Sequence, residues 1–63
     1  MNKKKLTAKQ VRLIRGDDSQ AALAKKLRCG VVAVSRWENG HHAPMLVHAE
    51  KLHRIAQQKG IEL

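Results

Sequence analysis

The side chains of this chain that could do specific chemistry lie in one short run, residues 31–36. Arg36 carries a planar guanidinium that can donate two parallel hydrogen bonds to a guanine, a contact that contributes roughly 1–3 kcal/mol of discrimination between bases. Val31 and Val32 offer no hydrogen bond, so they could discriminate only by packing on thymine methyl groups or by excluding other bases. Together with Ser35, these residues could read the edges of DNA bases if a helix presents them on one face.

The remaining reactive side chains do not form a catalytic or metal-binding pattern. His48 and His53 are five positions apart, so they do not share a helix face, and His41 and His42 have no thiol or suitably phased carboxylate beside them. Cys29 is the single cysteine, which excludes an internal disulfide and a thiolate zinc site and suits a reducing compartment. We therefore predict no catalytic residue, no metal site and no cofactor, and we do not expect an enzyme.

The charge balance indicates a polyanionic partner, because thirteen Lys and Arg oppose five Asp and Glu and give a formal net charge of +8. Hydrophobic residues make up 43% of the chain and aromatic residues only 2%, which favours packed helices over a sheet. The 63 residues suffice for one small domain. No apolar run is long enough for a signal peptide or a membrane span, so we expect a cytoplasmic, nucleoid-associated protein with no membrane partner.

The spacing of apolar residues and the capping signals predict four short helices, and a fifth helix stays possible. Thr7 and Gln10 form a capping box at the start of the first helix, with Leu6 and Val11 as a hydrophobic staple, and Ser19 is the expected N-cap of the second. The expected helices cover residues 8–15, 20–27, 31–38 or 31–39, and 46–59.

The second and third helices have the pattern of a helix-turn-helix. Leu23 and Leu27 fall on one face of the second helix, Val34 and Trp37 fall on one face of the third, and Ala24 is small enough for a close crossing. Such an arrangement holds the outer face of the third helix where it can enter a DNA groove. We therefore expect Val34 and Trp37 to lie in the core beneath the base-reading surface.

The fourth helix has an apolar face and is followed by an apolar tail. The residues expected on the inner face are Met45, Ala49, Leu52, Ile55 and Ala56. His48 is expected mostly outside. Beyond Gly60, Ile61 and Leu63 must either fold back onto the core or meet a second copy of the chain.

The sequence resembles the lambda-repressor-like (Cro/Xre-type) helix-turn-helix family. The residues that carry the likeness are Gln20, Leu23, Ala24, Leu27, residues 34–40 and Pro44. The likeness extends from about Leu6 to the C-terminus. It implies an all-α, compact, lambda-repressor-like domain over residues 7–63, with the helix-turn-helix at about 19–40. Residues 1–6 are expected to be a basic, flexible arm.

The turn departs from the family pattern at two positions. Arg28 stands where the family often has Gly, and Gly30 stands where the family has an N-cap Ser or Thr. If Arg28 adopts the left-handed conformation, the cost is on the order of 1 kcal/mol relative to Gly. Alternatively, Gly30 takes the positive φ and the turn shifts by a residue or two.

The resemblance also assigns DNA contacts, and its base-reading positions map onto Val31, Val32 and Arg36, with Ser35 on the same face. Alternatively, Val32 packs inward and Arg36 is a solvated surface cation. The DNA backbone is expected to be contacted by Gln20, Asn39, His41, His42, Lys25, Lys3, Lys4 and Lys5. For the lysines the alternative is a solvated side chain.

These observations predict a sequence-specific DNA-binding transcriptional regulator, a repressor that reads double-stranded DNA with its third helix as a homodimer. Two other hypotheses stay open. One is the antitoxin of a toxin-antitoxin pair, and the other is a protein-interaction module that retains the fold. The sequence does not identify a protein partner such as a toxin or RNA polymerase.

Overall fold

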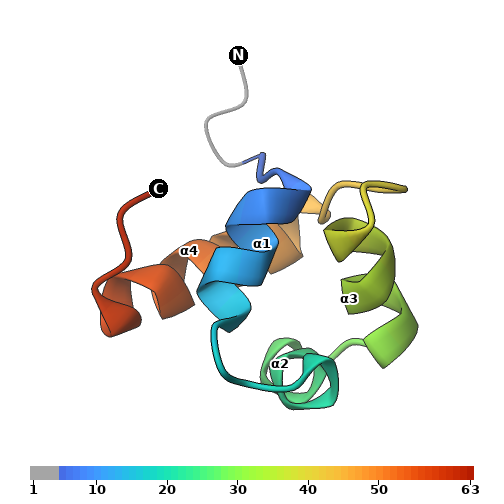
Figure 1. The fold of residues 1–63 in the computed structure, drawn as a ribbon, viewed down its shortest axis with the longest axis horizontal. Helices are drawn as coiled ribbons and strands as arrows, with labels where there is room; N and C mark the ends of the chain where they lie inside the picture. The colour runs from blue at the N-terminus through green and yellow to red at the C-terminus, as the bar shows by residue number, and fades with distance from the viewer. Residues whose placement is uncertain (1–4) are drawn as a thin grey trace.

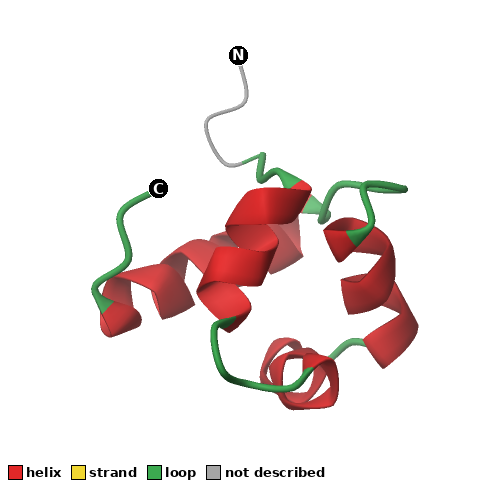
Figure 2. Ribbon diagram, in the orientation of Figure 1, coloured by secondary structure: helices red, strands yellow, loops and turns green. Residues whose placement is uncertain are grey.

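The computed structural model describes residues 5–63, which form four α-helices in chain order. They are α1 (Ala8–Arg15), α2 (Gln20–Leu27), α3 (Val31–Glu38) and α4 (Leu46–Lys59), joined by short loops (Figures 1 and 2). Helix α1 packs against α3 and α4, and α2 packs against the same two helices. The prediction of an all-α domain with four helices is confirmed, since residues 5–63 contain neither a strand nor a fifth helix.

Two capping interactions set the starts of α1 and α2 where the sequence places them. The backbone N–H of Thr7 donates to Gln10 Oε1 at 3.0 Å, and the N–H of Gln10 donates back to Thr7 Oγ1 at 3.2 Å. At the start of α2, Ser19 Oγ accepts from the N–H of Ala22 at 3.0 Å. Each such cap stabilises its helix by about 1 kcal/mol. Leu6, within the expected arm, is buried in the core.

The core is built from aliphatic side chains of all four helices around the single tryptophan. Val34 is completely buried and Trp37 is 5% exposed, which confirms their predicted place beneath the outer face of α3. The other buried hydrophobic residues are Leu6, Val11, Ile14, Leu23, Ala24, Leu27, Ala49, Leu52 and Ala56. Because α3 contributes two of its largest side chains to this core, its orientation is fixed by packing.

The start of α4 differs from the predicted face in two respects. Met45 is 68% exposed, because it is the N-cap residue with extended backbone (φ −63°, ψ 159°) and does not continue the helical face. His48, expected mostly outside, is half-buried with its ring 5.3 Å from that of Trp37. Leu46 and Val47 are also more than half exposed, so α4 begins with an apolar surface.

The C-terminal tail folds back in part. The N–H of Ile61 donates to the carbonyl of Ala56 at 2.8 Å, and the Ile61 side chain packs half-buried against the core. Leu63 stays 44% exposed. Of the two fates predicted for the tail, folding back therefore holds for Ile61, while Leu63 stays at the surface.

The turn between α2 and α3 uses the first of the two predicted geometries. Arg28 adopts the left-handed conformation (φ 57°, ψ 45°) and ends α2. Gly30 has ordinary extended backbone (φ −82°, ψ 151°) and begins α3 without a side-chain cap. Between them Cys29 packs half-buried against the core, and this burial raises the pKa of its thiol. The structure thus keeps a strained residue in the turn.

Replacing Arg28 by glycine is expected to raise the free energy of unfolding by about 0.5–1 kcal/mol, because glycine adopts a positive φ without steric cost but loses more entropy on folding. Urea unfolding followed by Trp37 fluorescence measures this change. Arg28→Ala is the control, since it removes the charge and keeps the steric penalty, and we expect no gain from it. Equal stabilisation by both variants would show that charge, and not backbone strain, matters at this position.

The end of α4 is tied to the end of α1 through Lys59 and Asp18. Lys59 Nζ donates to the carbonyl of Ile14 at 2.9 Å and to Asp18 Oδ2 at 3.1 Å. Lys26 Nζ, on α2, donates to the same Asp18 oxygen at 3.1 Å. The Lys26 and Lys59 ammonium groups lower the pKa of Asp18 below its ordinary value. The ionised Asp18 carboxylate therefore links α2 and α4.

We expect this link to make stability depend on pH. A carboxylate whose pKa is lower in the folded state stabilises the protein above its unfolded pKa, about 3.9 for Asp, and loses that effect as the pH falls through the folded pKa. The free energy of unfolding of the wild type should therefore decline more below about pH 4 than that of Asp18→Asn. Asp17→Asn is the control, since Asp17 makes no ion pair with another described residue. Parallel curves for the wild type and Asp18→Asn would contradict the expectation.

Candidate DNA-binding surface

The outer face of α3 presents the four predicted base-reading residues together. Val31 is 45% exposed, Val32 is 58% exposed, Arg36 is exposed and Ser35 is half-buried. With Asn39 they span about 140° of the helix circumference at ~100° per residue. The opposite side of α3 is packed against the core. Val32 therefore points outward and does not pack on α2.

Arg36 belongs to this face and is exposed. The structure shows no ion pair between Arg36 and another residue of the range 5–63. By contrast, Arg12 and Arg15 of α1 both donate hydrogen bonds to Glu38. The donors of Arg36 can thus turn to an external acceptor such as a base edge or a phosphate.

Ser35 and Asn39 are linked along the same face. Asn39 Nδ2 donates to Ser35 Oγ at 3.3 Å, and the backbone N–H of Asn39 donates to the Ser35 carbonyl at 2.9 Å. The Ser35 hydroxyl thus has a partner at the C-terminal end of α3. The N-terminal part of the outer face carries only Val31 and Val32.

A buried carboxylate fixes the C-terminal end of α3 against α1 and α2. The Glu38 side chain is 4% exposed and receives both arms of the Arg15 guanidinium, with Nε to Oε2 at 2.6 Å and Nη2 to Oε1 at 3.0 Å. Gln20 Nε2 donates to Glu38 Oε1 at 3.3 Å, and Arg12 Nη2 donates to the Glu38 carbonyl at 2.6 Å. We call these four residues the Glu38 cluster. The hydrogen bond to Glu38 raises the pKa of Arg15 above its ordinary value.

The Glu38 cluster is the part of the site that the sequence pattern does not predict. The basic side chain that pairs with the Glu38 carboxylate is Arg15. Nothing local in the sequence singles out Arg12 and Arg15, which lie 26 and 23 positions away from Glu38. Their spacing of three on α1 is a weak signal, because it places both on one side of that helix.

The residues predicted to contact the DNA backbone lie at several places around α3. Gln20 is half-buried at the start of α2 with its amide bonded to Glu38, so it has a partner inside the protein. The exposed residues of this set are Lys5, Lys25, Asn39, His41 and His42. Lys3 and Lys4 lie outside the described residues. The predicted contacts of all these residues with phosphates stay predictions.

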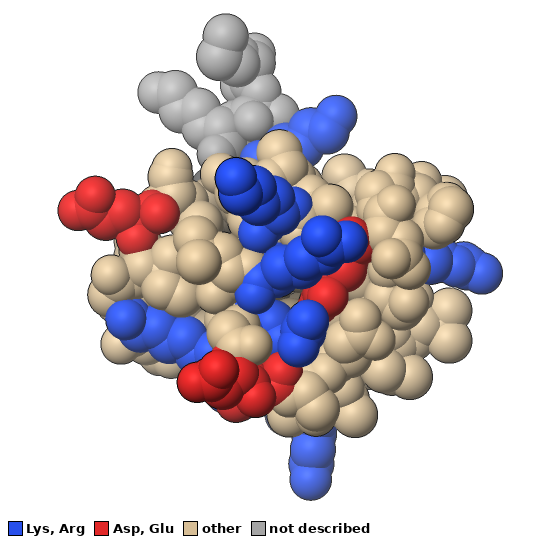
Figure 3. Space-filling model, viewed as in Figure 1, with Lys and Arg blue, Asp and Glu red and all other residues tan. Residues whose placement is uncertain are grey.

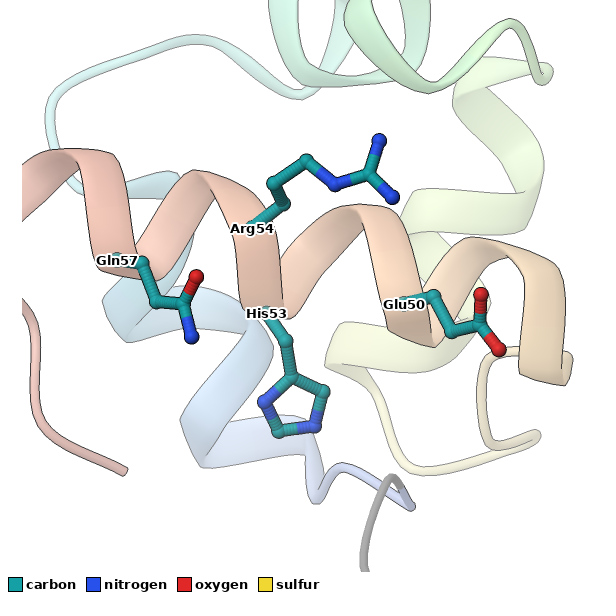
Figure 4. A pocket seen from close by; sticks show the side chains of 4 residues that line it. All are labelled: Glu50, His53, Arg54 and Gln57. Carbon is teal, nitrogen blue, oxygen red and sulfur yellow. The ribbon is translucent and has the colours of Figure 1, made fainter.

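The positive charge of the chain is not gathered into one patch on the face shown in Figure 3. There, acidic side chains lie directly beside basic ones and offset part of their charge. A shallow pocket lies elsewhere, on α4, and its lining residues Glu50, His53, Arg54 and Gln57 all come from that one helix (Figure 4). It brings together no residues from different elements.

Two other classes of site find no support within the described part of the chain. No group of three His, Cys, Asp or Glu side chains in residues 5–63 lies close enough to hold a metal ion. In the same range, none of the helices is both long and apolar enough to span a membrane.

Comparison with known protein families identifies a match. The family model described as helix-turn-helix matches residues 9–58, which include all of α2 and α3. No curated protein and no solved structure matches the chain significantly.

Proposed function

Because the chain belongs to the lambda-repressor-like helix-turn-helix family, whose members are DNA-binding regulators, we propose that it is a sequence-specific transcriptional repressor. Its α3 enters the major groove of double-stranded DNA, with Val31, Val32, Ser35 and Arg36 at the base edges. The main support for this proposal is that these four residues lie on the outer side of α3. The opposite side of the helix, with Val34 and Trp37, is buried in the core. The place of action is then DNA of the cytoplasmic nucleoid.

Contacts with DNA phosphates are expected on either side of the contacts with the bases. The N-terminus of α2, beside Gln20, favours an anion through its helix dipole. Asn39, His41 and His42 lie just past α3. Exposed Lys25 and the lysines of the N-terminal segment, Lys3, Lys4 and Lys5, supply positive charge along the duplex. Such contacts position the protein without selecting sequence.

We further propose that the protein binds as a homodimer on a two-fold symmetric site, because one small domain contacts few base pairs. Apolar surface for this contact is present at the start of α4 and in the tail, where Met45 just before the helix, Leu46, Val47 and Leu63 are 44–68% exposed. Sedimentation at rising concentration, free and with DNA, tests this assembly. A strict monomer under both conditions would contradict it.

A salt titration tests DNA binding itself. The affinity for a mixed-sequence duplex, measured by fluorescence anisotropy, is expected to fall with a log-log slope of about 0.9 per phosphate neutralised. A protein-interaction module that retains the fold would show no such dependence. The absence of binding to any duplex at low ionic strength would end the proposal.

A further inference from the structure

The N-terminal half of the α3 outer face, formed by Val31 and Val32, is apolar. It can therefore select only bases that present an apolar group in the major groove. We propose that Val31 and Val32 read the C5-methyl groups of pyrimidines in the major groove, so that 5-methylcytosine is accepted where thymine is. This inference rests on the proposed function, since it assumes that α3 enters the groove. It goes beyond the proposed function because it makes the affinity of the protein for a site depend on methylation of the cytosines in that site.

Val31 and Val32 are the first two residues of α3, and neither side chain can donate or accept a hydrogen bond. Gly30, directly before them, has no side chain, and a Cβ placed there would meet nothing within 4 Å. One turn further on, the hydroxyl of Ser35 accepts from Asn39 Nδ2. The surface at the start of α3 is therefore made of methyl groups, with 45% of Val31 and 58% of Val32 exposed.

A surface of methyl groups makes no hydrogen bond, so it cannot detect the polar groups that distinguish thymine from cytosine. Thymine presents an O4 acceptor and cytosine an N4 donor, which only a hydrogen-bonding side chain can tell apart. The C5-methyl group is the one major-groove feature of thymine that a valine contacts favourably. Methylation gives cytosine the same group at the same place. A contact made by Val31 or Val32 therefore responds to the methyl group and not to the identity of the base that carries it.

Duplexes with substituted bases test the proposal by removing or adding a single methyl group in each duplex. The preferred site is first selected from random duplexes, and each of its thymines is then replaced by deoxyuridine, which removes only the methyl group. At one or two positions per half-site we expect about a fourfold loss of affinity, the effect of one buried carbon. At those positions, a cytosine should bind more weakly than 5-methylcytosine by a similar factor of about four.

Protein variants assign the effect to the two valines. Val31→Ala and Val32→Ala are expected to reduce the difference between thymine and deoxyuridine at the position that each side chain contacts, because alanine keeps only one of the three side-chain carbons of valine. Leu13→Ala is the control, because Leu13 is 53% exposed on α1, outside the proposed DNA and dimer surfaces, and its truncation should leave the methyl effect intact. Thermal unfolding of each variant checks that the fold is kept.

The outcomes separate this inference from the proposed function. Specific binding that is unchanged by deoxyuridine at every position would overturn the methyl readout and leave the DNA-binding proposal standing. A methyl effect of undiminished size in both alanine variants would also overturn the readout by the two valines, and the DNA-binding proposal would still stand. A lack of salt-dependent binding to any duplex would overturn both proposals.

Discussion

Arg36→Ala is expected to abolish the base preference at one symmetric pair of positions in the selected site. Because a bidentate arginine contact with guanine contributes roughly 1–3 kcal/mol of discrimination, the affinity for the preferred duplex should fall by about 5- to 150-fold. Selection from random duplexes with the wild type and the variant measures the preference, and titration of the preferred duplex measures the affinity. The outward position of Arg36, without an ion pair in the described structure, is the reason for a change this specific.

Arg54→Ala is the matched control for this experiment. Arg54 is an exposed arginine of α4, a different helix from the one that carries the base-reading residues (Figure 4). Its removal changes the net charge equally and should leave the selected sequence as it is. If Arg36→Ala weakens binding to all sequences uniformly, Arg36 contacts a phosphate and its assignment as a base reader is wrong.

Glu38→Gln is expected to destabilise the fold by about 1.5–3 kcal/mol, because it removes the charge of a buried carboxylate that accepts hydrogen bonds from Arg15 and Gln20. The loss should stay below that of a fully buried pair, since the Arg15 side chain keeps 26% of its surface exposed to water. In a domain of this size such a loss is a large part of the total stability. Urea unfolding followed by Trp37 fluorescence measures it.

Two comparisons make the Glu38 experiment decisive. Glu62→Gln removes the same charge from an exposed residue of the tail and should change stability by less than about 0.5 kcal/mol, as is usual for surface substitutions. Arg15→Met combined with Glu38→Leu should recover part of the loss, because buried ion pairs can be replaced by apolar contacts. A Glu38→Gln variant as stable as the wild type would show that the Glu38 cluster does not hold α3 in place.

Local interactions explain why the helix boundaries could be predicted. The capping box of Thr7 and Gln10 and the Ser19 cap involve residues three positions apart, so the sequence displays both partners together. The choice between Arg28 and Gly30 for the left-handed position was not predictable in this way. Both geometries satisfy the local sequence, and the packing of α2 against α3 decides between them.

In the candidate site, too, the features that depend on local sequence could be predicted and those that depend on tertiary contacts could not. Helical periodicity was sufficient to place Arg36 outside and Trp37 inside, because both follow from the repeat of one short helix. The partner of Glu38 is set by how α1 crosses the end of α3, which is a tertiary contact without a local signal. Met45 was misplaced for a related reason, since the apolar repeat of α4 was extended past the point where its helical backbone begins.

The central claim is that the outer face of α3 meets a duplex, and amide shift mapping by nuclear magnetic resonance tests it most directly. Labelled protein is titrated with the selected duplex at low ionic strength. We predict the largest shifts at Val31, Val32, Ser35 and Arg36 and at the start of α2, and small shifts at Arg54 and Gln57 of α4. Shifts confined to α4, or no shifts at all, would contradict the claim.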